Sequence, residues 1–121
     1  MSDIPSTHDA NAHGPDWQAD LLNAVWSQHK DLLEDRLRTI ERATKALAQD
    51  RLDVDLRRNA ERAAHTLAGS LGMFGFEDAS RAAHDLELVL EFTHPTRDRA
   101  AALSGLLSRV REGTQGPVHR I

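Results

Sequence analysis

Hydrophobic residues recur every three or four positions along most of the chain, which is the spacing of a helix that buries one face. Between Asp16 and Ala68 there is neither glycine nor proline, so long helices can persist in this part. The first run comprises Leu22, Val25, Trp26, His29, Leu33, Leu37, Ile40, Ala43 and Leu47. Because this run is longer than an average helix, we expect a kink or break near residues 27–30.

Three more runs follow, and each is bounded by residues that start or end helices. Asp53 is suited to be the N-cap of the second helix, whose pattern stops at residues 72–75. The third helix is expected to begin near Phe76 and to end at residues 93–96, and the fourth to end at Gly113. The positions expected to face inward are Leu56, Ala60, Ala63, Ala64, Leu67, Leu71, Ala79, Ala83, Leu86, Leu90, Ala100, Leu103, Leu106, Leu107 and Val110.

Short connections between consecutive helices predict an all-α fold, an antiparallel up-down four-helix bundle with an additional N-terminal helical segment. The bundle is expected to occupy residues 16–112. Residues 1–15 contain Pro5, Gly14 and Pro15 and show no periodicity, so they are predicted to form a disordered leader. Residues 113–121 are predicted to form a flexible tail.

Composition supports a helical fold and excludes several kinds of chemistry. Aromatic residues make up only 4% of the chain, so the core must consist of leucine and alanine, which suits close-packed helices. The absence of cysteine excludes disulfides, thiol catalysis and thiolate metal sites. A net charge of -4 disfavours nucleic-acid binding. No apolar run approaches the roughly 18–20 residues that span a bilayer, and no signal peptide is visible, so we expect a cytoplasmic protein without membrane contact.

Aromatic side chains are expected at one end of the bundle. Around the turn at 72–75, Met73, Phe74 and Phe76 are expected to belong to the core, with a partner contact as the alternative. Trp17 and Trp26 are expected to cover the open end of the bundle.

The candidate for chemistry is His65, which lies on the outer face of the second helix. At about 100° per residue, His65 is about 180° away from Leu56, so its imidazole should be exposed. Gly69 follows one turn later, where glycine costs about 1 kcal/mol relative to alanine. A larger side chain there would crowd any group attached to the imidazole or docking on it. Position alone also allows an ordinary surface histidine and a glycine that serves helix packing.

The stretch Ala64-His65-Thr66-Leu67-Ala68-Gly69-Ser70, followed by Gly75 and by Leu86-Glu87, resembles the histidine-containing phosphotransfer (HPt) domain family. In that family, a receiver domain that carries an aspartyl phosphate phosphorylates an exposed histidine of a helical bundle. The histidine then passes the phosphoryl group to another receiver. The resemblance covers roughly residues 51–91 at the level of motifs and the whole helical region in architecture.

The resemblance implies a phosphorelay intermediate rather than a free-standing enzyme. His65 would be the phosphoacceptor, Gly69 the small residue beside it and Gly75 the turn glycine. The implied partner is the receiver domain of a response regulator, a hybrid histidine kinase, or both. No cofactor is expected in this chain, because in such systems the Mg²⁺ belongs to the receiver.

One residue departs from the pattern of the family. Ala68 occupies the position, three residues after His65, where the family commonly has a lysine that stabilises phosphoryl oxygens. Arg62 is the nearest candidate substitute and Arg58 a more distant one, whereas Glu61 on the same face disfavours a phosphate. Glu61, Arg58 and Gly72 are expected to contact the partner.

Two other functions stay open at this point. One is a docking module that binds a receiver or kinase but has lost efficient transfer, which Ala68 would favour. The other is a metal site, but di-iron bundles place Glu-x-x-His on inward faces, whereas Glu61 and His65 both point outward. His84, Asp85 and Glu87 are interpreted as ordinary charged helix positions, and His29 as a packed histidine, so no metal site is expected. The chain has no Walker-type loop and no kinase motifs.

Overall fold

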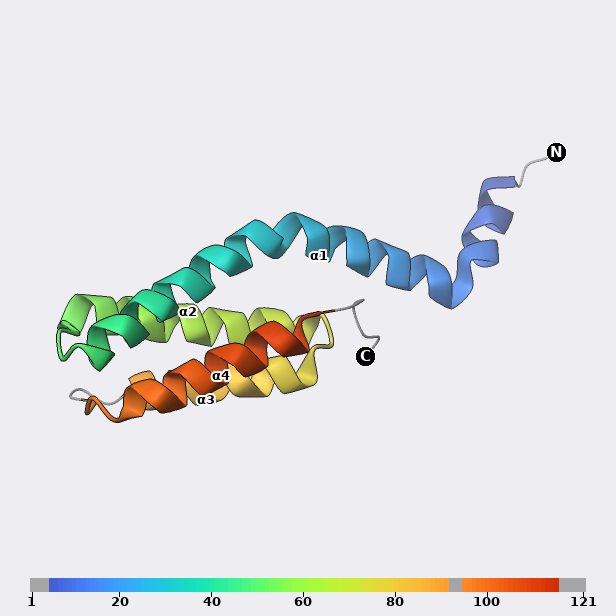
Figure 1. Cartoon of the computed structure of the whole chain (residues 1–121). Coiled ribbons are helices and arrows are strands. Elements are labelled where there is room, and N and C mark those ends of the chain that lie inside the picture. The colour runs from blue at the N-terminus through green and yellow to red at the C-terminus, as the bar shows by residue number, and fades with distance from the viewer. Residues whose placement is uncertain (1–4, 92–94, 116–121) are drawn as a thin grey trace.

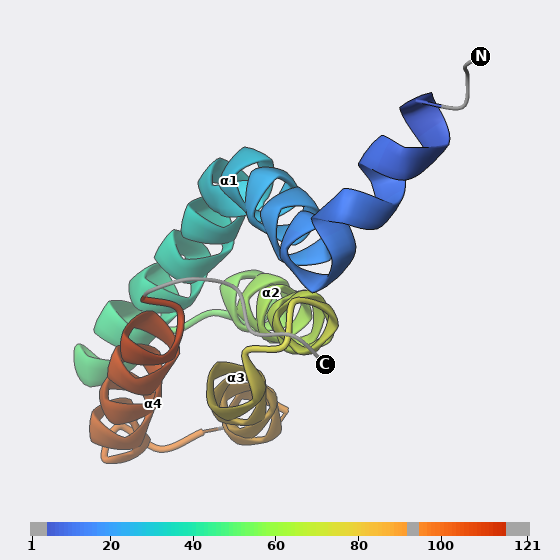
Figure 2. The same ribbon diagram turned by 90° about the vertical axis from the view of Figure 1, so that its right-hand side faces the viewer.

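The computed structural model describes the backbone of residues 5–91 and 95–115, and the side chains of these ranges from Trp17 onward. Its helices are α1 (Pro5–Ala48), α2 (Val54–Met73), α3 (Glu77–Leu90) and α4 (Arg99–Gly113). They pack in a ring in which α1 contacts α2 and α4, and α3 contacts α2 and α4 (Figures 1 and 2). The predicted antiparallel four-helix bundle is therefore confirmed.

Helix α1 agrees with one prediction and differs from another. It is continuous through residues 27–30, where Figure 1 shows the ribbon changing direction, so of the predicted kink or break the kink is found. Residues 5–15, predicted as a disordered leader, have helical backbone in the structure, while residues 1–4 lie outside the described part of the chain. Proline is tolerated at the first position of a helix, where Pro5 stands, and a helix accommodates an internal proline such as Pro15 by bending. Figure 1 shows such a bend in the blue part of α1, which extends beyond the bundle as the predicted additional segment.

The ends of α2 follow from the residues that the sequence places there. The carboxylate of Asp53 accepts a hydrogen bond of 2.7 Å from the backbone N–H of Leu56, as predicted for an N-cap. At the other end, Gly75 has φ 82°, a conformation that favours glycine. The N–H of Phe76 donates to the carbonyl of Leu71 at 2.9 Å and the N–H of Gly75 to that of Gly72 at 3.1 Å, which is a Schellman motif.

The core consists mainly of leucine and alanine, with three aromatic residues at one end. Nearly all predicted inward positions of α2, α3 and α4 are buried, whereas Leu56 and Leu106 are partly buried. The ring of Trp26 lies 5.1 Å from that of Phe74 and 4.7 Å from that of Phe76, centroid to centroid. Phe74 and Phe76 belong to the core, as predicted, and of the two tryptophans expected to cover the end of the bundle only Trp26 is buried.

Three residues that were expected in or over the core are more exposed than predicted. Met73 lies seven residues after the exposed Thr66 and therefore on the same side of α2, where it is exposed. Trp17, in the N-terminal part of α1, is exposed as well. His29 is exposed too, although its ring stands edge-on to Phe74 at 6.0 Å, so it borders the core rather than lying in it.

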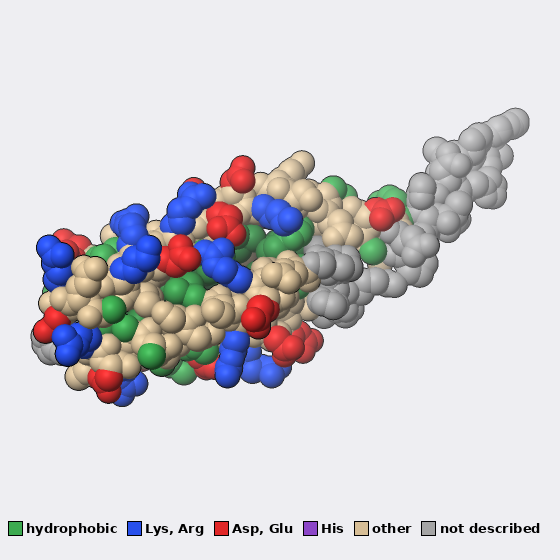
Figure 3. Space-filling model, viewed as in Figure 1, with side chains coloured by type: hydrophobic (Ala, Val, Ile, Leu, Met, Phe, Trp, Pro, Cys, Tyr) green, Lys and Arg blue, Asp and Glu red, His purple; other side chains and the backbone are tan. Residues whose placement is uncertain are grey.

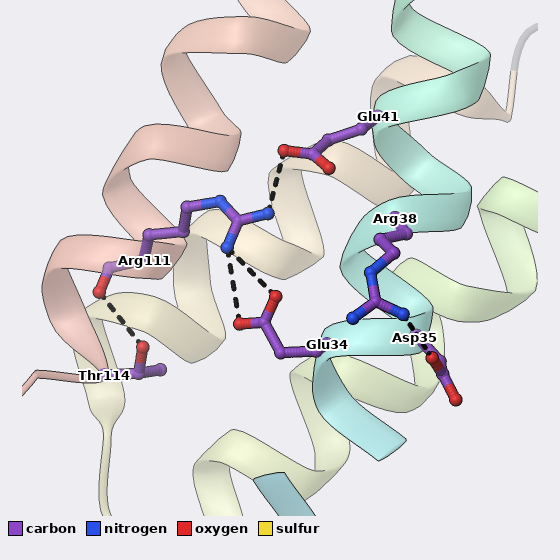
Figure 4. Close-up of polar contacts among 6 residues, drawn as sticks. All are labelled: Glu34, Asp35, Arg38, Glu41, Arg111 and Thr114. Atoms are coloured by element: carbon purple, nitrogen blue, oxygen red, sulfur yellow. Dashed lines mark hydrogen bonds and ion pairs between the residues drawn. The ribbon is translucent and has the colours of Figure 1, made fainter. Parts of the chain in front are cut away.

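Helices α1 and α4 are joined by one arginine. Arg111 of α4 donates to both carboxylate oxygens of Glu34 at 3.3 Å and to Glu41 at 2.8 Å, two turns further along α1 (Figure 4). Partial burial alone would lower the pKa of Arg111, but the bonds to Glu41 and Glu34 outweigh it and raise that pKa. Beside this contact lies a groove of about 510 Å³, lined by residues that include Trp26 and Leu67. Figure 3 shows hydrophobic side chains between basic and acidic ones on this face.

Two glycines allow a test of this backbone. Gly75→Ala should lower the free energy of unfolding by about 1 kcal/mol, because a Cβ disfavours the positive φ of the turn. Gly105→Ala should raise it by about 1 kcal/mol, because a Cβ there meets open space in the middle of α4. Urea unfolding measures both. Equal stabilities for the two variants would contradict the turn described here.

Candidate functional site

His65 lies in the middle of α2, on the side that faces away from the core. Its side chain is 74% exposed, as helix geometry predicts from its position opposite Leu56. Because it lies far from both ends of a packed helix, its backbone is held firmly while its ring reaches the surface. The site is therefore a reactive ring on a rigid support.

A carboxylate from the neighbouring helix holds one nitrogen of this ring. Nδ1 of His65 lies 2.9 Å from Oε2 of Glu87 in α3, whose side chain is only 19% exposed. An ionised carboxylate only accepts hydrogen bonds, so Nδ1 must carry the proton in this contact. In the neutral imidazole, Nε2 then has the free lone pair, and it points away from Glu87.

Small residues at the α2–α3 contact bring Glu87 within reach. The hydroxyl of Ser80 donates to the backbone carbonyl of Ala68 at 2.7 Å. A Cβ added to Gly72 would lie 3.3 Å from the Ser80 Oγ, so the two helices approach closely here. Glu87 lies two turns after Ser80 on the same side of α3, which places it beside His65.

A second histidine contacts the same carboxylate. His84 lies three residues before Glu87 in α3, and its Nδ1 is 3.7 Å from the Glu87 Oε1. In the sequence analysis, the polar residues at 84–87 were interpreted as ordinary charged positions of a helix. Glu87 was mentioned otherwise only as part of the motif of the family. Its contact with His65 was missed because it depends on the spacing between two helices, which no local pattern reports.

Glu61 is paired with an arginine that the sequence analysis did not single out. Arg57 is buried, donates to the backbone carbonyl of Leu90 at 2.8 Å and lies 3.4 Å from the Glu61 carboxylate. The positive charge of Arg57 therefore offsets the negative charge one turn before His65. The burial of Arg57 could have been predicted from the sequence, because Arg57 lies three residues before Ala60 and seven before Ala64. It therefore shares the inward side of the helix with these two alanines.

The remaining predicted site residues lie around this centre in different ways. Arg62 is exposed and donates to the side-chain oxygen of Asn59 at 3.3 Å, and Arg58 is exposed one turn earlier. Gly69 faces open space, so it does not serve helix packing, whereas Gly72 turns toward Ser80. We therefore assign Gly72 to the α2–α3 contact, and its role in partner docking stays a prediction.

Two properties of the described part of the chain bear on other functions. Among the residues whose side chains are described, no group of three or more histidine, cysteine or acidic residues is arranged to hold a metal ion. Within the same part, no helix is both long and apolar enough to cross a membrane.

Comparison with known proteins identifies the family. Residues 24–113 match the family model described as the Hpt domain, which covers the bundle, His65 and Glu87. No match was found among curated proteins or among solved structures. Hpt domains are helical bundles that take part in two-component phosphorelays. Because the match spans more than half of the chain and the fold agrees with it, this chain belongs to the Hpt domain family.

Proposed function

We propose that this chain is a phosphorelay intermediate. His65 accepts a phosphoryl group from the aspartyl phosphate of a receiver domain and passes it to another receiver. The observation that carries the proposal is the contact of Nδ1 with Glu87 on an imidazole that is 74% exposed. It leaves Nε2 as the nucleophile at the surface, where a receiver can reach it.

The transfer requires no proton movement in this chain. The lone pair of Nε2 attacks the phosphorus in line, the N–P bond forms, and the bond from phosphorus to the aspartyl oxygen breaks. The electron pair of that bond leaves on the aspartate as a carboxylate. Nδ1 keeps its proton, so the phosphorylated ring carries a positive charge. In the forward transfer, a second aspartate attacks the phosphorus and the electron pair of the N–P bond returns to Nε2.

Glu87 stabilises this intermediate through its charge. Its carboxylate accepts the hydrogen bond from Nδ1 before the reaction and lies against the positive ring after it. The receiver would supply the Mg²⁺ and the aspartate that the transfer needs. The part of this chain is to hold and orient the imidazole.

The surface around His65 suits the approach of a second protein. Gly69 leaves open space one turn after His65. Arg58 and Arg62 are exposed on the same side of α2, and the charge of Glu61 is offset by Arg57. A receiver could therefore place its acidic site over Nε2 without meeting an unpaired carboxylate of α2.

A docking module without transfer is the second candidate, and Ala68 is the observation that favours it. Ala68 is partly buried, and its side chain has no charge to stabilise phosphoryl oxygens. In this alternative the bundle binds a receiver or kinase through the same surface. His65 would then not be phosphorylated.

Phosphoryl labelling separates the two candidates. Mixed with a receiver that carries radiolabelled aspartyl phosphate, the chain should gain label that is stable to alkali and labile to acid. His65→Gln should abolish this label, because Nε2 is the attacking atom. His29→Gln, at another exposed histidine, should label as the unaltered chain does.

Receiver binding is measured in parallel, for example by calorimetry. Tight binding without label would favour the docking module. In that case Ala68→Lys tests why transfer is absent. If the lysine variant becomes labelled, the absence of transfer is due to the missing positive charge at position 68. Binding without label in both forms would contradict the transfer function.

Gly69 offers a test in which stability and transfer change in opposite directions. Gly69→Leu should raise the free energy of unfolding by about 0.5–1 kcal/mol, because a side chain there meets open space and glycine is a poor helix former. The same change should slow transfer at least tenfold, because the leucine would occupy the space beside the imidazole. If it instead destabilised the fold and left transfer unchanged, Gly69 would be a packing residue.

Glu87 is a positioning residue, and its charge can be separated from its shape. Glu87→Gln keeps an oxygen that can accept from Nδ1 but loses the negative charge, and transfer should slow by about tenfold. Glu87→Leu should slow it further and increase the share of His65 with the proton on Nε2, which nitrogen NMR reports. An unchanged proton position in Glu87→Leu would contradict this role.

A further inference from the structure

Glu87 contacts two histidines, and the proposed function uses only one of them. We propose that His84 is a second positioning residue. By taking up or releasing a proton, it determines how strongly the negative charge of Glu87 acts on His65. The contact is a property of the chain itself, but its consequence for phosphotransfer rests on the proposed function.

The geometry allows both histidines to use the carboxylate at the same time. Nδ1 of His65 lies 2.9 Å from Oε2 of Glu87, and Nδ1 of His84 lies 3.7 Å from Oε1. His84 is 59% exposed, so it exchanges protons freely with water, whereas Glu87 is 19% exposed. The carboxylate is thus shielded between an accessible proton carrier and the reactive ring.

The other charges around the contact are mostly engaged elsewhere. On α3, Arg81 lies one turn before His84 and 3.9 Å from Asp78, and Glu91 lies one turn after Glu87. On α2, the charge of Glu61 is paired with Arg57, and Arg62 bonds Asn59. Asp85 lies on the other flank of α3, in a groove shared with Arg109 and Glu112 of α4. Glu87 is the carboxylate that joins His84 to His65.

The proton on His84 has a defined effect on the site. Histidine changes its charge between pH 5 and 8, so both states are accessible under ordinary conditions. Protonated His84 forms an ion pair with Glu87 and weakens the pull of that carboxylate on the Nδ1 proton of His65. Neutral His84 leaves the full charge of Glu87 to His65.

Protonation of His84 and phosphorylation of His65 should therefore oppose each other. Protonated His84 offsets the carboxylate that stabilises the positive phosphorylated ring, so acidification disfavours the phosphorylated chain relative to the phosphorylated receiver. By linkage, phosphorylation of His65 disfavours the proton on His84. His84 thus makes the direction of transfer sensitive to pH.

The contact is tested without any phosphate, by NMR titration of the histidine rings in the full chain. The ring nitrogen resonances of His65 in His84→Gln should differ from those of the unaltered chain more at pH 6 than at pH 8, because only a protonated His84 alters the charge that acts on the ring. His29→Gln should produce no such pH-dependent difference. If His84→Gln produces none either, the inference is wrong.

The functional consequence is tested with a phosphorylated receiver between pH 6 and 8. The equilibrium share of label on the chain, compared with that on His84→Gln, should decrease about threefold from pH 8 to pH 6. The comparison cancels the pH dependence of the receiver. A ratio that does not change with pH would overturn the regulatory role. Absence of label on both forms at every pH would overturn the proposed function instead, and the NMR titration would still decide whether His84 acts on His65.

Discussion

The close approach of α2 and α3 is the constraint on which the site depends. Gly72 and the carbonyl of Ala68 meet Ser80, and this contact sets the distance between the two helices. The distance lets a short carboxylate side chain reach the histidine on the next helix. A bulkier residue at the contact would separate the helices and leave His65 an ordinary surface histidine. The chemistry of the exposed face is thus determined by packing beneath it.

Local patterns predicted those features that depend on one helix alone. The exposure of His65, the cap at Asp53 and the turn at Gly75 follow from spacing and backbone preference. The contact between His65 and Glu87 could not be predicted in this way, because residues 22 positions apart meet only after two helices pack. The extent of α1 was also missed, since proline and glycine were taken to end a helix that bends instead.

Charge around His65 is distributed differently from the pattern of the family. The usual lysine is replaced by Ala68, yet the negative charge of Glu61 is offset by the buried Arg57. That arginine also binds the last turn of α3 through the carbonyl of Leu90, so it links charge balance with helix packing. Arg58 and Arg62 carry the positive charges that are exposed on this side of α2. Their side chains are long and flexible, so they can adapt to a partner.

The junction between α1 and α4 has a consequence for motion. Arg111 joins these helices through Glu34 and Glu41, and its side chain is partly open to water. Dissolved ions weaken such contacts, whereas they hardly affect the apolar contacts beneath α2 and α3. The ring of helices should therefore open first along the α1–α4 junction, on the opposite side of the bundle from the α2–α3 contact. Fluctuations of the long first helix can then occur while the distance between His65 and Glu87 is preserved.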